Sequence, residues 1–273
     1  LPLIGVERMV QRVDRDATLS LPTRRRRQIC CDGARVQWGD AALLDLFCDA
    51  AGVPRRIGYL PGAEWSGGLP AGFYATVAAL ACAWRGDVPL HASAVAWQGR
   101  AVLVAGPAGA GKSTSIAAML AAGALLIGDD LSVLGWRDGL ALVRRGRPDM
   151  RLHPDTLAIV SHDVPPRPAD DGSGKWIVRP SRQIGDDAVP LGALLLLGEG
   201  DGLLAPVAAA PAMPALLFRP RLQAGIPGYR EGLARLIDCA ARHPVMAVGR
   251  PRDFTPAGLR AHGERLLAIA GSA

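Results

Sequence analysis

The stretch Gly106-Pro-Ala-Gly-Ala-Gly-Lys-Ser-Thr114, hereafter the glycine-rich segment, decides the fold class of this chain. It fits the pattern G-x-x-x-x-G-K-S/T, with a strand candidate at residues 101–105 before it and a helix candidate at residues 112–122 after it. Glycines at these places let the backbone form a nest of inward-pointing N–H groups, and the helix N-terminus adds partial positive charge. The segment therefore predicts a phosphate-binding loop in an α/β fold. The alternative is an ordinary glycine-rich turn, which the Lys-Ser pair and both flanking elements disfavour.

The side chains of this segment indicate a nucleoside triphosphate as the ligand. Lys112 is expected to bridge the outer phosphates, and the Ser113 hydroxyl is expected to ligate Mg²⁺. The predicted cofactors are thus ATP and Mg²⁺. The residues expected to contact the nucleotide are Gly106, Ala108, Gly109, Ala110, Gly111, Lys112, Ser113 and Thr114.

Two adjacent carboxylates, Asp129 and Asp130, follow an apolar strand candidate at residues 124–127. Proteins with such loops place a carboxylate at a strand end facing the magnesium ion. Neighbouring side chains on an extended backbone point to different sides, so one carboxylate can hold the metal while the other acts as a general base. An Asx turn into the next strand is the structural alternative.

The pattern along the rest of the chain predicts two domains. Residues 1–88 hold short apolar runs with Gly and Pro between them, which indicates a small N-terminal α+β domain, and residues 89–273 alternate between strand and helix patterns. A polar stretch at residues 161–175 is expected to be a mobile loop. The elements predicted elsewhere are helices at 73–84, 112–122, 229–242 and after Thr255, hairpins at 93–105 and 131–143, and strands at 124–127, 193–197 and 245–248.

Composition narrows the classes of partner. A net charge of +6 with no dense basic stripe and few aromatic residues argues against a nucleic-acid partner. Apolar runs fall well short of the roughly 18 residues that a membrane-spanning helix needs, so we expect a cytoplasmic protein with no membrane partner. Five cysteines in no paired spacing predict reduced thiols. The cluster Arg24–Arg27 indicates a solvated face, with a docking patch for an acidic peptide as the alternative.

Three further runs carry a family resemblance. Residues 90–94 (LHASA), 99–103 (GRAVL) and 128–133 (GDDLSV), together with the glycine-rich segment, resemble the HPr kinase/phosphorylase family and its uncharacterised kinase relatives. The resemblance is close over about residues 90 to 135 and looser toward the end, where residues 248–254 (VGRPRDF) look like the family's passage from strand to last helix. It implies the P-loop kinase fold of the HPr kinase/PEP carboxykinase-like type, with a mixed sheet and a homo-oligomeric assembly.

The resemblance also implies roles for individual residues. Asp130 would be the base that takes the proton from an acceptor serine, His91 would support it, Lys112 would be the third catalytic group, and Asp129 would lie near the metal with Ser113. Thr114 stands where the bifunctional members carry Glu, which argues against phosphorylase activity and against HPr as acceptor. Asp149 and Asp155 are candidates for a further metal carboxylate. Lys175 and Arg179 are candidates for closing over the phosphates, with an ordinary solvated strand pair as the alternative.

These observations predict an ATP-dependent kinase that phosphorylates a serine hydroxyl of a peptide or small protein. Such divergent relatives resemble kinases of ribosomally made peptide pathways, including lasso-peptide clusters, where a precursor peptide is the acceptor. Two alternatives stay open: a kinase of a small-molecule hydroxyl, and a regulatory protein that binds nucleotide without transfer. An enclosed acceptor pocket beside Asp130 would favour the small molecule, and an open groove would favour the peptide.

Overall fold

The computed structural model describes residues 5–14, 17–21, 27–30, 33–38, 42–62, 72–169, 172–199, 202–224, 226 and 228–272. Cys31 and most of the Arg24–Arg27 cluster lie outside these residues. The helices are α1 (Phe73–Trp84), α2 (Lys112–Ala121), α3 (Pro154–Leu157), α4 (Pro206–Ala209), the 3₁₀ helix η1 (Ala210–Leu216), α5 (Pro220–Gln223), α6 (Tyr229–Arg242) and α7 (Pro256–Gly271). None of the helices described is at once long enough and apolar enough to cross a membrane.

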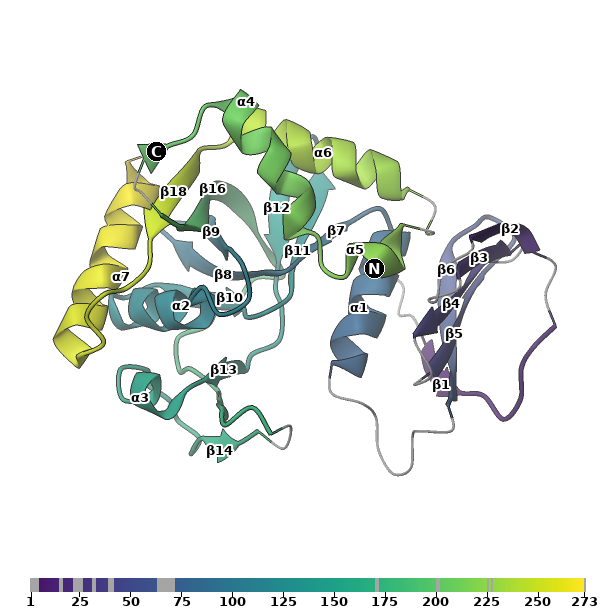
Figure 1. Ribbon diagram of the computed structural model, residues 1–273, viewed down its shortest axis with the longest axis horizontal. Coiled ribbons are helices and arrows are strands. Elements are labelled where there is room, and N and C mark those ends of the chain that lie inside the picture. Colours follow the sequence, from purple (N-terminus) through teal and green to yellow (C-terminus); the bar gives the residue numbers. More distant parts are fainter. Residues whose placement is uncertain are drawn as a thin grey trace. The chain divides into compact units, whose positions relative to one another are not determined.

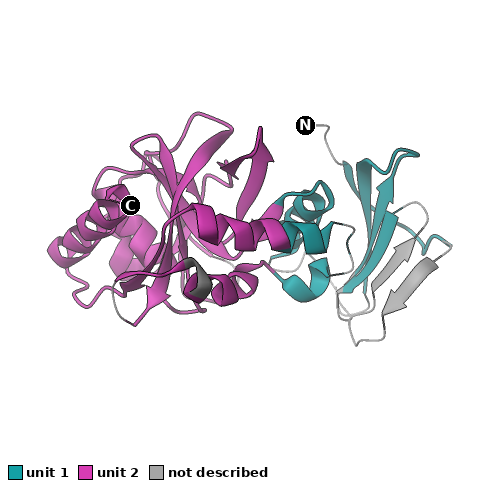
Figure 2. Cartoon of the chain, turned by 90° about the horizontal axis from the view of Figure 1, so that it is seen from above, with its two compact units in different colours: residues 1–87, 219–233 teal, residues 88–218, 234–273 magenta. Residues whose placement is uncertain are grey.

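The chain divides into two compact units (Figure 2). Unit 1 comprises residues 1–87 and 219–233, and unit 2 comprises residues 88–218 and 234–273. Unit 1 thus contains a segment from the second half of the chain, so each unit is built from two stretches of sequence. An independently folding N-terminal domain over residues 1–88 stays a prediction.

Unit 1 is a six-stranded sheet with α1 against one face. The strands are β1 (Gly5–Arg8), β2 (Ala17–Leu21), β3 (Arg27–Cys30), β4 (Gly33–Trp38), β5 (Ala42–Cys48) and β6 (Pro54–Pro61), in the spatial order β1-β6-β5-β4-β3-β2. Leu44 and Ile57 of the sheet pack with Phe73 and Leu80 of α1 in a buried apolar cluster. Val36 of β4 belongs to the same cluster. Because side chains alternate along a strand, Arg35 and Asp45, the neighbours of Val36 and Leu44, point to the opposite face. There Arg35 donates two hydrogen bonds of 2.6 and 2.7 Å to the fully buried Asp45.

Unit 2 contains a nine-stranded mixed sheet (Figure 1). Its strands are β7 (Val88–Leu90), β8 (Ala92–Trp97), β9 (Arg100–Ala105), β10 (Leu125–Gly128), β11 (Ser132–Arg137), β12 (Leu140–Arg144), β16 (Ala188–Gly198), β17 (Gly202–Leu203) and β18 (Val245–Gly249). The long strand β16 joins the parts of the sheet because it pairs in parallel with β9 and β18 and antiparallel with β12. The predicted mixed α/β architecture is confirmed.

A small second sheet in unit 2 was not predicted. It has three short strands, β13 (Met150–Leu152), β15 (Trp176–Val178) and β14 (Arg167–Pro168), in that order. Alternate residues Met150, Leu152 and Val178 are buried in the same apolar cluster as the α2 residues Ile116 and Met119. The sheet therefore lies against the helix that follows the glycine-rich segment. The stretch 161–175 contains β14, and residues 170–171 within it are outside the described part, so the predicted mobile loop stays a prediction.

The predicted elements around the glycine-rich segment agree with the structure to within a few residues. The hairpin of β8 and β9 turns at Gln98 and Gly99, and the helix α2 ends before Gly123, whose φ of +108° lets its N–H bond back to Leu120. The helices predicted at 73–84 and 229–242 are confirmed as α1 and α6, and Thr255 caps α7 by accepting a 3.1 Å bond from the Gly258 N–H. The fold thereby places the segment between the buried strand β9 and the helix α2.

Candidate active site

The glycine-rich segment turns sharply between β9 and α2. Gly109 and Gly111 have φ of +76° and +92°, in the left-handed region that glycine adopts without strain. Gly106 is needed for a different reason, since a Cβ there would lie 3.0 Å from the carbonyl oxygen of Leu197. Ala110 N–H closes the turn on the Pro107 carbonyl at 3.1 Å. The three glycines of the motif therefore have local structural causes, and the turn ends at the N-terminus of α2.

Lys112, the first residue of α2, is buried to 8% exposure. Its ammonium donates to the carbonyl oxygens of Gly106 at 3.0 Å and Pro107 at 3.2 Å, so it folds back over the turn. Burial lowers its pKa, the carboxylates of Asp130 and Asp129 act in the opposite direction, and the positive charge of Lys175 lowers it further. A cation held at the N-terminus of a helix is suited to binding an anion with several charges.

Asp129 collects hydrogen bonds from three elements. Ser113 of α2 donates at 3.0 Å to Oδ1 and 3.2 Å to Oδ2, Ser93 of β8 donates at 2.6 Å to Oδ1, and the Arg151 N–H of β13 donates at 3.1 Å to Oδ2. The structure thus brings together Asp129 and Ser113, the two residues predicted to lie near the metal, and their role there stays a prediction. Ser93 and the Arg151 amide were missed, because a single Ser within an apolar strand and a backbone N–H have no sequence signature.

Asp130 turns away from its neighbour. Its φ of +67° lies in the left-handed region, which Asp tolerates better than most residues, and its N–H donates to Ser93 Oγ at 3.3 Å. Asp130 Oδ1 lies 3.4 Å from His91 Nε2. The side chains of His91 and Asp130 are 42% and 60% exposed. The two adjacent carboxylates therefore have different surroundings: Asp129 is half-buried among hydrogen-bond donors, and Asp130 is exposed to solvent.

His91 is fixed from its backbone. It precedes β8, its N–H donates to the Leu216 carbonyl at 2.7 Å, and its ring centroid lies 6.1 Å from that of Phe218. Both contacts come from the end of η1 and the residues after it. The structure thus brings His91 to Asp130, and Ser113 to Asp129, on the same strand end beside Lys112.

The donor set beside Ser113 fits Mg²⁺. A hydroxyl and a carboxylate are hard oxygen ligands, and Mg²⁺ in nucleotide sites takes one or two carboxylates together with phosphate oxygens. Within the described residues no group of three or more His, Cys, Asp and Glu side chains could hold a metal ion on its own.

The other candidate residues have separate positions. Asp149 pairs with Arg179 at 2.9 Å and with Arg147 at 3.8 Å. The predicted metal carboxylate and the predicted phosphate-binding arginine thus form an ion pair with each other. Asp155 is exposed in the first turn of α3, where it accepts from Thr156 Oγ1 at 3.3 Å. Lys175 lies just before β15 and is near enough for its charge to act on Lys112. Of these four residues, Lys175 is connected to the site, because its charge acts on the pKa of Lys112.

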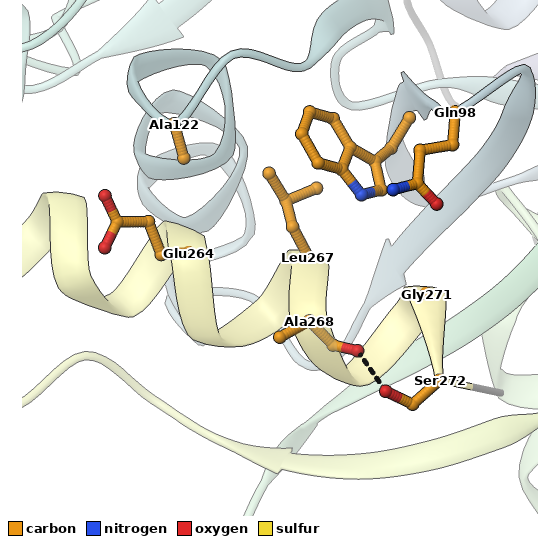
Figure 3. Close-up of a pocket in the computed structure, with 8 residues that line it drawn as sticks. Gln98, Ala122, Glu264, Leu267, Ala268, Gly271 and Ser272 are labelled. Atoms are coloured by element: carbon orange, nitrogen blue, oxygen red, sulfur yellow. Dashed lines mark hydrogen bonds between the residues drawn. The ribbon is translucent and has the colours of Figure 1, made fainter.

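A cavity of about 360 Å³ lies at the other end of α2 (Figure 3). It is lined by the C-terminal ends of α2 and α7 and by the β8–β9 turn, including Ala122, Gln98, Glu264 and Leu267. A second cavity of about 300 Å³ is lined by Leu126, Ile127, Arg145, Gly146, Arg147, Pro148, Gln183 and Ile184. Neither cavity includes His91, Lys112 or Asp130.

Comparison with known proteins gives likeness to solved structures alone. No family model and no curated protein matches the chain. Among solved structures, the chain is similar to the HPr(Ser) kinase/phosphatase from Coxiella burnetii, with 14% sequence identity over 66% of this chain and 98% of that chain, at a TM-score of 0.31. The functional assignments that follow therefore rest on the side chains of this chain.

Proposed function

We propose that this protein is an ATP-dependent kinase that transfers the γ-phosphoryl group to a serine hydroxyl of a peptide or small protein. The observation that carries the proposal is the separation of two carboxylates at one strand end: Asp129 accepts from Ser113, and Asp130 lies 3.4 Å from His91. Lys112 stands beside both, since each carboxylate acts on its pKa. In this proposal one carboxylate serves the metal side of a phosphoryl transfer and the other serves the acceptor side.

The residues have distinct tasks in this proposal. The backbone amides of the glycine-rich segment and the Lys112 ammonium bind the β- and γ-phosphates in place of the loop carbonyls of Gly106 and Pro107. Ser113 and Asp129 would hold Mg²⁺, which when bound neutralises charge on the phosphates. Positioning and neutralisation supply most of what a phosphoryl transfer requires.

Asp130 performs the proton transfer. The acceptor oxygen forms a bond to the γ-phosphorus as the bond to the β–γ bridging oxygen breaks, the hydroxyl proton passes to Asp130, and ADP leaves. His91 orients the Asp130 carboxylate through the 3.4 Å contact, and its own backbone is held by Leu216. His91 is thus a positioning residue and Asp130 the catalytic base.

The exposure of Asp130 favours a peptide acceptor over a small molecule. Its side chain is 60% exposed, and neither cavity described above is lined by it. A small metabolite is usually enclosed in a pocket that covers most of its surface, whereas a side chain of a peptide can reach a catalytic group at the surface. We include in this proposal that the acceptor peptide is a ribosomally made precursor peptide and that the phosphorylated residue is one of its serines.

The test is transfer of labelled γ-phosphate from ATP to serine-containing peptides, beginning with the peptide encoded beside the gene, with free serine in a parallel reaction. We expect label on a peptide serine and little on free serine. Asp130→Asn should retain ATP binding and lose transfer by about 10²-fold or more, the range for removing a general base. His91→Gln should lose less, and the loss should fall on kcat rather than on the ATP affinity.

The control is Asp155→Asn, an exposed carboxylate with no place in the proposed mechanism. It should phosphorylate at the rate of the unaltered protein. Label on free serine in preference to peptides would contradict the peptide acceptor and support a small-molecule acceptor. Full transfer activity in Asp130→Asn would eliminate Asp130 as the base.

A further inference from the structure

The segment between β18 and α7 has no role in the proposal above. It reads Arg250-Pro251-Arg252-Asp253-Phe254, and all of its residues except Pro251 are exposed. Phe254 is 54% exposed, which places a large aromatic face in water. An exposed aromatic beside two arginines is a combination that binding surfaces favour over ordinary solvated loops.

The packing of α7 on α2 determines where this segment lies. Ser115 Oγ of α2 lies 3.3 Å from His262 Nε2 of α7, and Ala118 faces Gly263 one turn further along. Residues near the ends of both helices, Ala122 and Leu267, line the same cavity (Figure 3). The residue numbers rise together along this contact, so the lower-numbered residues of the α7 region lie toward the lower-numbered end of α2. The glycine-rich segment is at that end of α2.

One short distance supports this placement. Pro251 is buried, and its Cδ lies 3.8 Å from the position that a Cβ at Gly111 would occupy, so the two residues are neighbours. The backbone on either side of Phe254 is also fixed. Asp253 accepts from the Thr255 N–H at 2.8 Å, and Thr255 accepts from the Gly258 N–H at 3.1 Å as the cap of α7. Phe254 is thus carried on an ordered turn that begins at the glycine-rich segment.

We infer that residues 250–254 recognise the part of the nucleotide beyond its phosphates, with Phe254 stacking on the base. This inference rests on the proposed function, because it assigns the base end of the same ligand. Every nucleobase offers a flat face, and stacking on an aromatic side chain covers apolar surface on both partners. Arg250 and Arg252 supply positive charge beside the ribose and the first phosphate.

The experiment compares two ligands by calorimetry at saturating Mg²⁺. Inorganic tripolyphosphate has the three phosphates but no base, so it reports the phosphate site alone, whereas ATP reports both. For the unaltered protein we expect ATP to bind more tightly than tripolyphosphate. Phe254→Ala should weaken ATP by at least about fivefold, the lower end of what one base-stacking contact contributes, and leave tripolyphosphate unchanged. Phe254→Trp should restore the affinity for ATP.

The control is Leu140→Ala, which removes another exposed apolar side chain of unit 2, 63% exposed at the start of β12. It should change neither affinity. Equal affinity for ATP and tripolyphosphate in the unaltered protein, or an equal loss of both in Phe254→Ala, overturns the base-stacking role while the phosphate site stands. If neither ligand binds the unaltered protein, the proposed function falls, and the role of Phe254 falls with it.

Discussion

Ser113 Oγ lies 3.0 Å from Asp129 Oδ1 and 3.2 Å from Oδ2, so the hydroxyl of the first α2 turn faces both oxygens of the strand-end carboxylate. Ser93 and the Arg151 N–H also donate to Asp129, which makes it the junction of β8, α2 and β13. The next residue, Asp130, has 60% of its side chain in solvent. The chain therefore contains one carboxylate that is held by donors and one that is accessible to an acceptor.

Asp129→Asn should weaken nucleotide binding in a magnesium-dependent way. An amide lacks the negative charge that attracts Mg²⁺, and its NH₂ group cannot accept from Ser113, Ser93 or Arg151. We expect the affinity for ATP with Mg²⁺ to fall by about tenfold or more, within the range for a metal site that has lost a charged ligand. Calorimetry with Mg²⁺ and with excess chelator measures both states. An equal loss in the two conditions would show that Asp129 has a structural task only.

The pH dependence of triphosphate binding should report Lys112. Its pKa is lowered from 10.5, chiefly by burial and also by Lys175, while Asp130 and Asp129 act the other way. On raising the pH, the charged ammonium is therefore lost sooner than for an ordinary lysine. We expect the affinity for tripolyphosphate to fall through this lowered pKa.

Lys175→Gln provides the test of that assignment. Removing a like charge raises the pKa of Lys112, so the alkaline loss of affinity should move to higher pH. The midpoint of the loss is the quantity to compare, measured by titration from about pH 7.5 to 10.5 across the expected window. Arg182→Gln, which changes an exposed cation that donates to the Gly123 carbonyl at 3.4 Å, serves as the matched charge control. A midpoint that moves to lower pH in Lys175→Gln would contradict the electrostatic coupling.

Much of the fold could be predicted because its signals are local. The turn of the glycine-rich segment is predicted by its own glycines, which adopt positive φ. The start of α7 is predicted by Thr255 as its N-cap and by Pro256 as its first residue. The helix α1 could be predicted from a continuous apolar run of helical length. Such signals come from residues that are neighbours in the sequence, so they can be recognised without knowledge of the tertiary structure.

The features that could not be predicted depend on distant residues. Strands β13 and β15 have three residues each, too few for a periodic pattern, and they exist because Met150 and Val178 are buried against α2. Asp149 precedes β13 and Arg179 follows β15, so their ion pair depends on the pairing of these two strands. Without that pairing in view, both residues were candidates for the site. The role of Ser93 depends on its distance to Asp129 and not on its neighbours in sequence.

The close approach of α7 to α2 predicts a strong effect of a small substitution. A Cβ at Gly263 would overlap the Ala118 carbonyl and would lie 2.8 Å from the Met119 nitrogen, and both are backbone atoms of α2 that cannot rotate away. The helices would have to separate, which disturbs the Ser115–His262 contact and the apolar cluster beneath. We expect Gly263→Ala to lower the free energy of unfolding by about 1–3 kcal/mol or more, despite the higher helix propensity of Ala.

The matched control lies on the same helix. At Gly271 a Cβ would have Gln98 Oε1 at 3.7 Å as its nearest neighbour, which is ordinary contact, so Gly271→Ala should be neutral or slightly stabilising. Urea unfolding followed by far-UV circular dichroism measures both variants against the unaltered protein. Because α2 starts at Lys112, Gly263→Ala should also weaken tripolyphosphate binding, whereas Gly271→Ala should not. Equal stability of the two variants would mean that the two helices can move apart without cost, and the α2–α7 contact that helps to position Phe254 would then lose its support.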